Sequence, residues 1–254
     1  MSNKYGKHVI YFSPTGGCRA IAEAIASVRD ELTDITLPEA RADKQEFDTN
    51  ETCVFVFPVY NRNIPDVCAD YIKRSDGRNA RAVVICVYGG VTKGRSLENA
   101  AGLLAARNFR PEFGAYVPAP HFYSSVKYNL IGESRSEGVS AFVNGENAVT
   151  KTLYYARPAR KSAQKLMKSL TGKCAFDSSR CTSCGACSKI CPVGAIDASL
   201  KTSDKDCILC GACADKCPSG ARKIKFRTPL PRLFIGAKMR VRDTEFYILE
   251  NKLR

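Results

Sequence analysis

Apolar residues gather in four short runs in the first half of the chain, with helix-like segments between them. The runs cover residues 8–13, 53–60, 81–90 and 113–120 and are rich in β-branched and aromatic side chains. Segments with helical spacing follow three of them, at 18–28, 66–74 and 96–108. Near-continuous apolar strands separated by helices are typical of a parallel sheet covered on both faces. We therefore expect an α/β fold with a doubly wound parallel sheet.

The pattern changes in the second half of the chain. Residues 121–150 are polar and mixed, and they suit either a mobile lid or a partner-docking loop, with Tyr123, Tyr128 and Phe142 as its large side chains. Residues 156–170 predict a basic helix, and a tail of mixed apolar and basic residues ends the chain. We expect this tail to pack over the cysteine-rich segment before it. The expected units are an α/β domain at 1–148, a basic helical linker at 149–173, a small α+β domain at 174–228 and a basic tail at 229–254.

Composition and the first residues of the chain indicate the expected cellular location. No apolar run reaches the roughly 18 residues of a membrane-spanning helix, and the first residues show no signal-peptide pattern. The expected location is therefore the cytoplasm. The thirteen cysteines of such a protein are better explained as metal ligands and buried thiols than as disulfides. The net charge of +14 comes from the two stretches 147–173 and 218–254, which flank a neutral cysteine-rich segment.

Eight cysteines form two copies of the pattern Cys-x2-Cys-x2-Cys-x3-Cys-Pro. Thiolates at this spacing wrap [4Fe–4S] clusters, and the fourth cysteine of each copy binds the cluster of the other copy. Four-cysteine zinc sites also use Cys-x2-Cys pairs, but they need neither the third cysteine nor the Cys-Pro. The pattern predicts two [4Fe–4S] clusters. One is assigned to Cys181, Cys184, Cys187 and Cys217, and the other to Cys207, Cys210, Cys213 and Cys191.

A turn rich in small and hydroxyl residues joins the first predicted strand to the first helix. It reads Ser13-Pro14-Thr15-Gly16-Gly17-Cys18. A strand–turn–helix of this kind directs backbone N–H groups and a helix N-terminus at an anion. The alternative is a tight turn before a capped helix, without a ligand.

These two motifs carry a resemblance to known families. Residues 174–224 resemble a bacterial-type two-cluster ferredoxin, and residues 5–120 resemble flavodoxins, so that the chain is similar to flavodoxin–ferredoxin fusion proteins of anaerobic microbes. The resemblance implies bound FMN. It implies a phosphate site at Ser13, Thr15, Gly16, Gly17 and Cys18, and contacts to the flavin ring from Pro58, Val59, Tyr60, Asn61, Tyr88, Gly89 and Gly90. Cys18 departs from the flavodoxin pattern, which has a hydroxyl there, and Gly17 replaces a common asparagine.

The expected function is electron transfer between two clusters and a flavin, with redox proteins as partners. An alternative is an oxidoreductase that reduces a small molecule at the flavin, for which His121 is a candidate proton donor. A third hypothesis is a cluster-based sensor that binds nucleic acid through the basic segments. No glycine-rich dinucleotide motif supports direct oxidation of NAD(P)H.

The remaining cysteines and histidine have plainer interpretations. Cys53, Cys68 and Cys86 fall in apolar patterns and predict buried thiols. Cys174 lies outside the repeated motif, and His8 opens the first strand and is expected to be structural.

Overall fold

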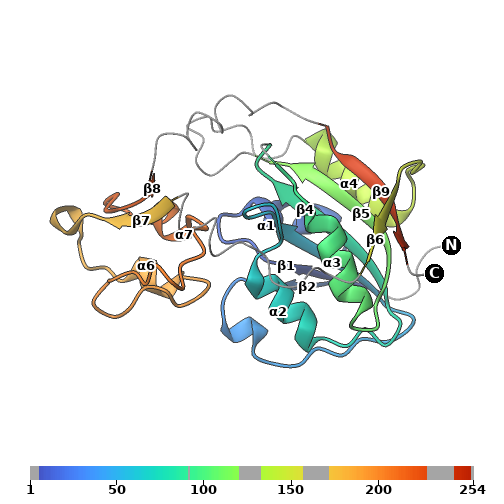
Figure 1. Ribbon diagram of the computed structural model, residues 1–254, viewed down its shortest axis with the longest axis horizontal. Helices are drawn as coiled ribbons and strands as arrows, with labels where there is room; N and C mark the ends of the chain where they lie inside the picture. The colour runs from blue at the N-terminus through green and yellow to red at the C-terminus, as the bar shows by residue number, and fades with distance from the viewer. Residues whose placement is uncertain (1–5, 91, 120–132, 157–171, 228–242, 253–254) are drawn as a thin grey trace.

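A seven-stranded sheet forms the larger part of the molecule (Figure 1). The computed structural model describes residues 6–90, 92–119, 133–156, 172–227 and 243–252. The sheet has the order β2-β1-β3-β4-β5-β9-β6, and all neighbours are parallel except β5 and β9. Its strands are β1 (Lys7–Tyr11), β2 (Glu31–Asp34), β3 (Thr52–Pro58), β4 (Arg81–Tyr88), β5 (Arg110–Pro118), β6 (Thr152–Tyr155) and β9 (Glu245–Asn251).

The first five strands follow the order 2-1-3-4-5, which is one of the two common orders of doubly wound sheets. The predicted α/β fold is confirmed. The four apolar runs became β1, β3, β4 and β5. The short and mostly exposed β2 was not predicted, because it lacks an apolar run.

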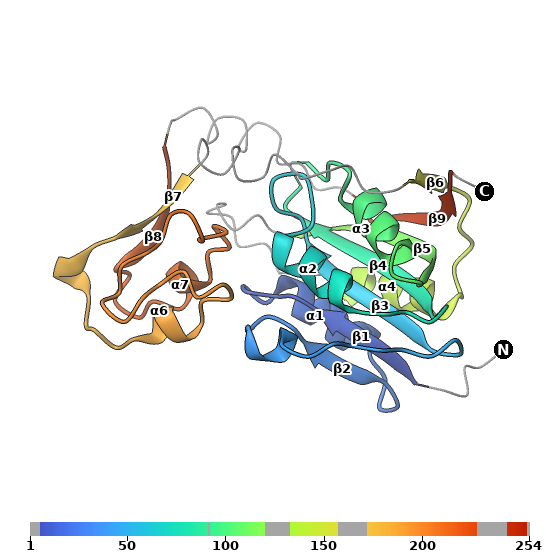
Figure 2. The same ribbon diagram turned by 60° about the horizontal axis from the view of Figure 1, so that its bottom comes forward.

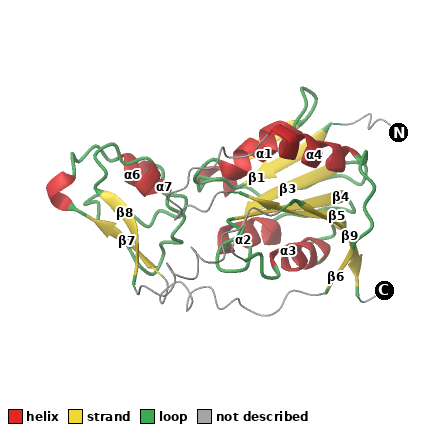
Figure 3. Cartoon of the chain, turned by 90° about the horizontal axis from the view of Figure 1, so that it is seen from above, coloured by secondary structure: helices red, strands yellow, loops and turns green. Residues whose placement is uncertain are grey.

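Helices cover both faces of the sheet (Figure 3). On one face lie α1 (Gly17–Ile25) and α4 (Glu133–Asn144), and on the other lie α2 (Asp66–Arg74) and α3 (Ser96–Ala105). Alternate residues of β3 point to opposite faces of the sheet and pack in the two apolar layers beneath the helices. Val54 and Val56 pack under α1 and α4, whereas Phe55 and Phe57 pack under α2 and α3. A central strand that is buried on both faces must be apolar throughout, which explains why its sequence signal was strong.

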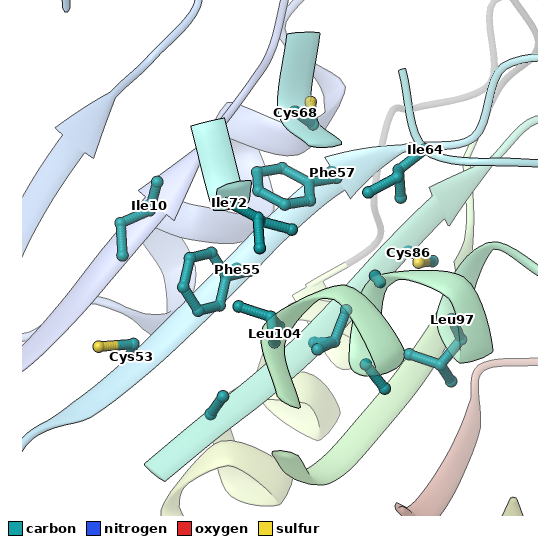
Figure 4. Packing of buried hydrophobic residues seen from close by; sticks show 14 of the residues in the cluster. Ile10, Cys53, Phe55, Phe57, Ile64, Cys68, Ile72, Cys86, Leu97 and Leu104 are labelled. Carbon is teal, nitrogen blue, oxygen red and sulfur yellow. The ribbon is translucent and has the colours of Figure 1, made fainter. Parts of the chain in front are cut away.

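The layer under α2 and α3 contains three of the free cysteines (Figure 4). Cys53, Cys68 and Cys86 are fully buried, as predicted. Burial disfavours the thiolate, and it raises the pKa of the Cys86 thiol to about 12. These side chains therefore act as small apolar residues that fill the core. His8 lies in β1 between Glu31 and Glu51, and this agrees with its expected structural role.

Part of the segment 121–150 belongs to the core. Phe142 in α4 is 2% exposed, and its ring centroid is 4.5 Å from that of Phe246 in β9. The expectation that Phe142 belongs to a mobile lid or docking loop is therefore wrong, because its side chain is needed to cover the sheet. Tyr123 and Tyr128 lie outside the described residues.

The C-terminal segment returns to the sheet. β9 pairs with β5 in the antiparallel direction and with β6 in the parallel direction. The expectation that the tail packs over the cysteine-rich segment is wrong for this part, because Tyr247 and Leu249 bury apolar surface in the α/β core instead. Since β6 precedes the cysteine-rich segment and β9 follows it, that segment is inserted between two strands of the sheet. The predicted helix at 156–170 falls almost entirely outside the described residues.

The inserted cysteine module, residues 172–227, is a small unit of its own (Figures 1 and 2). It contains an antiparallel pair of strands and three short helices. They are β7 (Gly172–Phe176), η2 (Ser178–Arg180), α6 (Ala186–Lys189), α7 (Ala212–Asp215) and β8 (Arg222–Phe226). None of the helices described in the chain is both long enough and apolar enough to cross a membrane.

Candidate iron–sulfur and flavin sites

The eight motif cysteines line two separate cavities in the cysteine module. Cys181, Cys184, Cys187 and Cys217 surround the first cavity. The second is lined by Cys191, Cys207, Cys210 and Cys213. The fourth cysteine of each repeat thus lies beside the first three of the other repeat, as the crossover rule expects. Within the described residues, no three His, Cys, Asp or Glu side chains converge closely enough to hold a single metal ion.

The two repeats have nearly the same backbone. Ser183 and its counterpart Leu209 both have φ of 54°, in the left-handed region. Gly185 and Gly211 follow at φ of 71° and 85° and begin α6 and α7. The left-handed turns wrap each loop around its cavity, and glycine adopts this conformation without steric cost.

Backbone N–H groups donate to four of the cysteine sulfurs in matching pairs. Ala195 and Ala221 donate to the Sγ atoms of Cys191 and Cys217, both at 3.2 Å. Ser183 and Leu209 likewise donate to Cys181 and Cys207, both at 3.4 Å. Hydrogen bonds to cysteine sulfur stabilise the thiolate and are one of the factors that set cluster potentials. The donor set, four sulfurs with N–H support around each cavity, fits a [4Fe–4S] cluster.

A buried arginine lies at the first cavity, and its role was not predicted from the sequence. The Arg222 side chain is 2% exposed, and its Nη1 donates to Thr202 Oγ1 at 2.6 Å while Nη2 donates to the Leu200 carbonyl. Its Nε has no hydrogen-bond partner among the described residues. Burial alone would lower the pKa of Arg222, but the sulfurs of Cys187 and Cys174 outweigh burial and raise it. A buried positive charge therefore lies at the first cavity and also reaches Cys174 and Thr202, which line the second.

A fifth cysteine lies at the second cavity. Cys174 in β7 lines it, and its Sγ is 3.5 Å from the Sγ of Cys213. Cys174 lies outside the repeated motif, so the cysteine spacing did not predict that it lines this cavity. The antiparallel pairing of β7 with β8 brings Cys174 into the module, opposite Ile224.

The loop between β1 and α1 presents unpaired backbone donors. In the described structure, the N–H groups of Thr15, Gly17 and Cys18 have no acceptor, and α1 has no side-chain cap. A Cβ placed on Gly16 or Gly17 would meet no other atom within 4 Å, so the space above the loop is open. The Ser13 hydroxyl accepts from the Arg19 N–H at 2.9 Å and holds the loop against the helix. Free donors at the start of a nine-residue helix fit a phosphate group.

Two side chains that were expected at the flavin lie elsewhere. Cys18 is 2% exposed and packs in the layer under α1, so only its backbone N–H remains available at the loop. The Tyr88 ring is buried under α2 and α3, with its centroid 6.2 Å from that of Tyr116. Cys18 lies on the face of α1 that packs on the sheet, and Tyr88 ends β4 on the side that faces α2 and α3.

The other expected flavin residues lie in two loops that follow neighbouring strands. Tyr60 forms a tight turn with Asn63 through two backbone hydrogen bonds, and Asn61 at its tip has φ of 49°. Gly90 ends the second loop with φ of 71°. These loops comprise Pro58, Val59, Tyr60 and Asn61 after β3, and Tyr88, Gly89 and Gly90 after β4.

The three loops lie at one edge of the sheet, because β1, β3 and β4 are parallel and in register. The Arg41 side chain, from η1 (Glu39–Arg41) after β2, lies at the same edge and donates to the Pro192 carbonyl of the cysteine module at 2.6 Å. The module therefore stands against the carboxyl end of the sheet, where doubly wound folds bind their ligands (Figures 1 and 2). His121, the candidate proton donor, lies outside the described residues.

Comparison with known proteins gives one result for the cysteine module. Residues 175–197 and 201–223 each match the family described as the 4Fe-4S binding domain. No curated protein matches the chain. The two matches contain all eight motif cysteines. They identify the module as a ferredoxin-like unit for [4Fe–4S] clusters and indicate that the protein takes part in iron–sulfur electron transfer.

Proposed function

We propose that this protein is an iron–sulfur flavoprotein that exchanges electrons with redox partner proteins. In this proposal the first cavity holds one [4Fe–4S] cluster, the second holds another, and the carboxyl end of the sheet holds FMN. The observation that carries the proposal is the position of the cysteine module, which touches the sheet at the edge where the three loops meet. A cofactor at this edge would lie next to the clusters.

The loops support FMN by two features. The open space above Gly16 and Gly17 and the free N–H groups suit the phosphate. The turns after β3 and β4 offer backbone groups and the half-buried Tyr60 for the ring. A flavin supplies the ability to exchange electrons singly or in pairs, which the clusters lack. Cys18 and Tyr88 contribute to this site through their backbones.

The test is cofactor analysis followed by a reductive titration of anaerobically purified protein. We expect about eight iron, about eight sulfide and one flavin per chain, with uptake of about four electrons, one for each cluster and two for the flavin. Uptake of about two electrons, with no FMN retained after incubation in excess FMN, would remove the flavin from the proposal and leave the clusters. Stoichiometric zinc without sulfide would contradict both.

A further inference from the structure

The second cavity is lined by five cysteines and the first by four. The fifth is Cys174, which lies there together with Cys191, Cys207, Cys210 and Cys213. Among the described residues that line the first cavity, the cysteines are its four motif members alone. The second cavity therefore offers one more sulfur than a [4Fe–4S] cluster binds.

Leucine occupies the equivalent position at the first cavity. Cys174 precedes Cys181 by seven residues, and Leu200 precedes Cys207 by the same number. Leu200 lines the first cavity, so each of these two residues lies at the cavity of the other repeat, as the fourth cysteines do. The two cavities thus differ at one matched position, where the second has a sulfur and the first an apolar side chain.

The Cys174 side chain is held against one particular ligand, Cys213. Strand alternation in β7 turns Cys174 inward, whereas its neighbour Lys173 is exposed. The Sγ atoms of Cys174 and Cys213 are 3.5 Å apart, and the two residues are 7% and 8% exposed. Ile224, the partner of Cys174 in β8, packs beside them. The two sulfurs are therefore in direct contact and shielded from solvent.

A thiolate at position 174 would have a charged partner. Arg222 is buried, and its positive charge acts on the sulfur of Cys174 as well as on that of Cys187. A buried charge is costly when it is unpaired. Since the thiolate is the form of cysteine that binds a metal, the nearby guanidinium makes this position suitable for a ligand.

We propose that Cys174 is an alternative ligand of the second cluster and is exchangeable with Cys213. In the exchange, the bond between one iron and the Cys213 sulfur breaks as a bond to the Cys174 sulfur forms. The proton of the Cys174 thiol passes to the released Cys213 thiolate, so the net charge is unchanged and no electron is transferred. An iron that loses Cys213 is thus bound again before it leaves. This inference rests on the proposed second cluster but does not require the flavin.

The exchange is tested by removing the resident ligand. The full chain is purified anaerobically as Cys213→Ala and as Cys187→Ala, which removes the equivalent ligand of the first cluster. We expect Cys213→Ala to keep about eight iron atoms per chain and the EPR signals of both clusters. Cys187→Ala should keep about four iron atoms and one signal. The double variant Cys174→Ala/Cys213→Ala should also fall to about four.

The first cluster reports in the same samples whether the module has folded. Loss of the second cluster, or of one of its irons, in Cys213→Ala that retains the first cluster would overturn the proposal. Equal iron contents of Cys213→Ala with and without Cys174 would also overturn it. Wild-type protein without clusters would instead contradict the proposed function, so the two failures are distinguishable.

A second measurement keeps Cys213 in place and does not depend on the folding of Cys213→Ala. Iron release to a chelator is followed for each cluster by its EPR signal in wild type, Cys174→Ala and Ile224→Ala. The control Ile224→Ala removes packing at the same contact but leaves the thiol. We expect Cys174→Ala to accelerate release from the second cluster severalfold without affecting the first, and Ile224→Ala to have a smaller effect. Equal acceleration in the two variants, or none in Cys174→Ala, would overturn the proposal.

Discussion

The guanidinium carbon of Arg222 lies 4.3 Å from the ring centroid of Phe176, so the first residue of β8 stacks on the last residue of β7. This stacking, together with the bonds to Leu200 and Thr202, holds a buried positive charge at the cavity of Cys181, Cys184, Cys187 and Cys217. A fixed cation stabilises a cluster more strongly in its reduced and more negative state. The second cavity has no arginine or lysine in its lining.

Arg222 lines the first cavity and reaches the second only through Thr202 and Cys174, so replacing it should change the potential of the first cluster more than that of the second. We expect Arg222→Gln to lower the potential of the first cluster by roughly 50–100 mV, where 59 mV is a tenfold change in a one-electron equilibrium. Arg222→Lys keeps the charge and should recover most of the shift. The exposed neighbour Lys223 provides the control Lys223→Gln, which should have a much smaller effect. A potentiometric titration followed by EPR measures both clusters, and equal shifts of the two would count against the local role.

Cysteine variants should fall into two groups that follow the cavities and not the repeats. Cys217→Ala and Cys184→Ala should lose the same cluster, although the two residues belong to different repeats. Cys191→Ala and Cys210→Ala should lose the other one. Iron analysis should give about four iron atoms per chain for each variant, and the EPR spectra should match within each pair. Spectra that match within a repeat would contradict the crossover.

A larger side chain in the open space above the phosphate loop should block FMN. Gly17→Val places its side chain where no protein atom lies within 4 Å, and valine is a better helix former than glycine. We expect at least about tenfold weaker FMN binding, because charge-assisted bonds to the phosphate contribute roughly 1.5–3 kcal/mol each, and no change for riboflavin. Gly138→Val in α4 is the matched control, since its Cβ is equally unobstructed. Equal loss of FMN and riboflavin would show that the variant disturbs something other than a phosphate site.

The position of Cys18 changes one expectation for this loop. The flavodoxin pattern has a hydroxyl at this position, so the sequence alone predicts that Cys18→Thr adds a donor to the phosphate and tightens FMN binding modestly. Because the Cys18 side chain is buried under α1, Cys18→Thr places a hydroxyl in an apolar layer. We expect it to lower the free energy of unfolding by about 1–3 kcal/mol without tightening FMN. Denaturant unfolding and FMN titration of the same variant measure the two effects.

Salt dependence should separate an electron carrier from a small-molecule reductase. Reaction with a redox protein depends on exposed charges, and these are screened at physiological salt, where the Debye length is about 8 Å. Turnover of a small substrate in a pocket that excludes water should depend far less on salt. We expect redox proteins to reoxidise the flavin faster than small molecules do. We also expect the rate of this reaction to fall as the salt concentration is raised. Saturable reduction of one small molecule that is insensitive to salt and lost in His121→Ala would favour the reductase.

The features that the sequence predicted best are those that local residue patterns determine. The apolar runs located four strands, and α2 was predicted at its observed ends because its spacing is regular. The cysteine spacing grouped the side chains around two cavities because ligand geometry follows directly from it. The difference between Thr182 of the first repeat and Ile208 of the second is also visible in the sequence, but it gains a meaning only because Ile208 packs against the apolar layer under α2 and α3.

Contacts between distant segments could not be predicted in this way. Arg41 and Pro192 are 151 residues apart, and neither belongs to a motif. The pairing of β9 with β5 depends on register across an inserted module, which one short apolar stretch does not reveal. Arg222 and Cys174 reach their cavities through the pairing of β7 and β8, and the spacing of the cysteines carries no information about it.

The insertion of the cysteine module between β6 and β9 has a consequence for how the protein is made. The ribosome produces β9 only after both cysteine repeats have been translated, so β5 lacks its outer neighbour until then. An unpaired strand edge invites pairing with other chains. Completion of the sheet and loading of both clusters can thus take place only after the cysteine module has been translated. If iron starvation leaves the module unfolded, β9 would be hindered from pairing with β5. The α/β domain would then be prone to aggregation, although the motif cysteines all lie in the module.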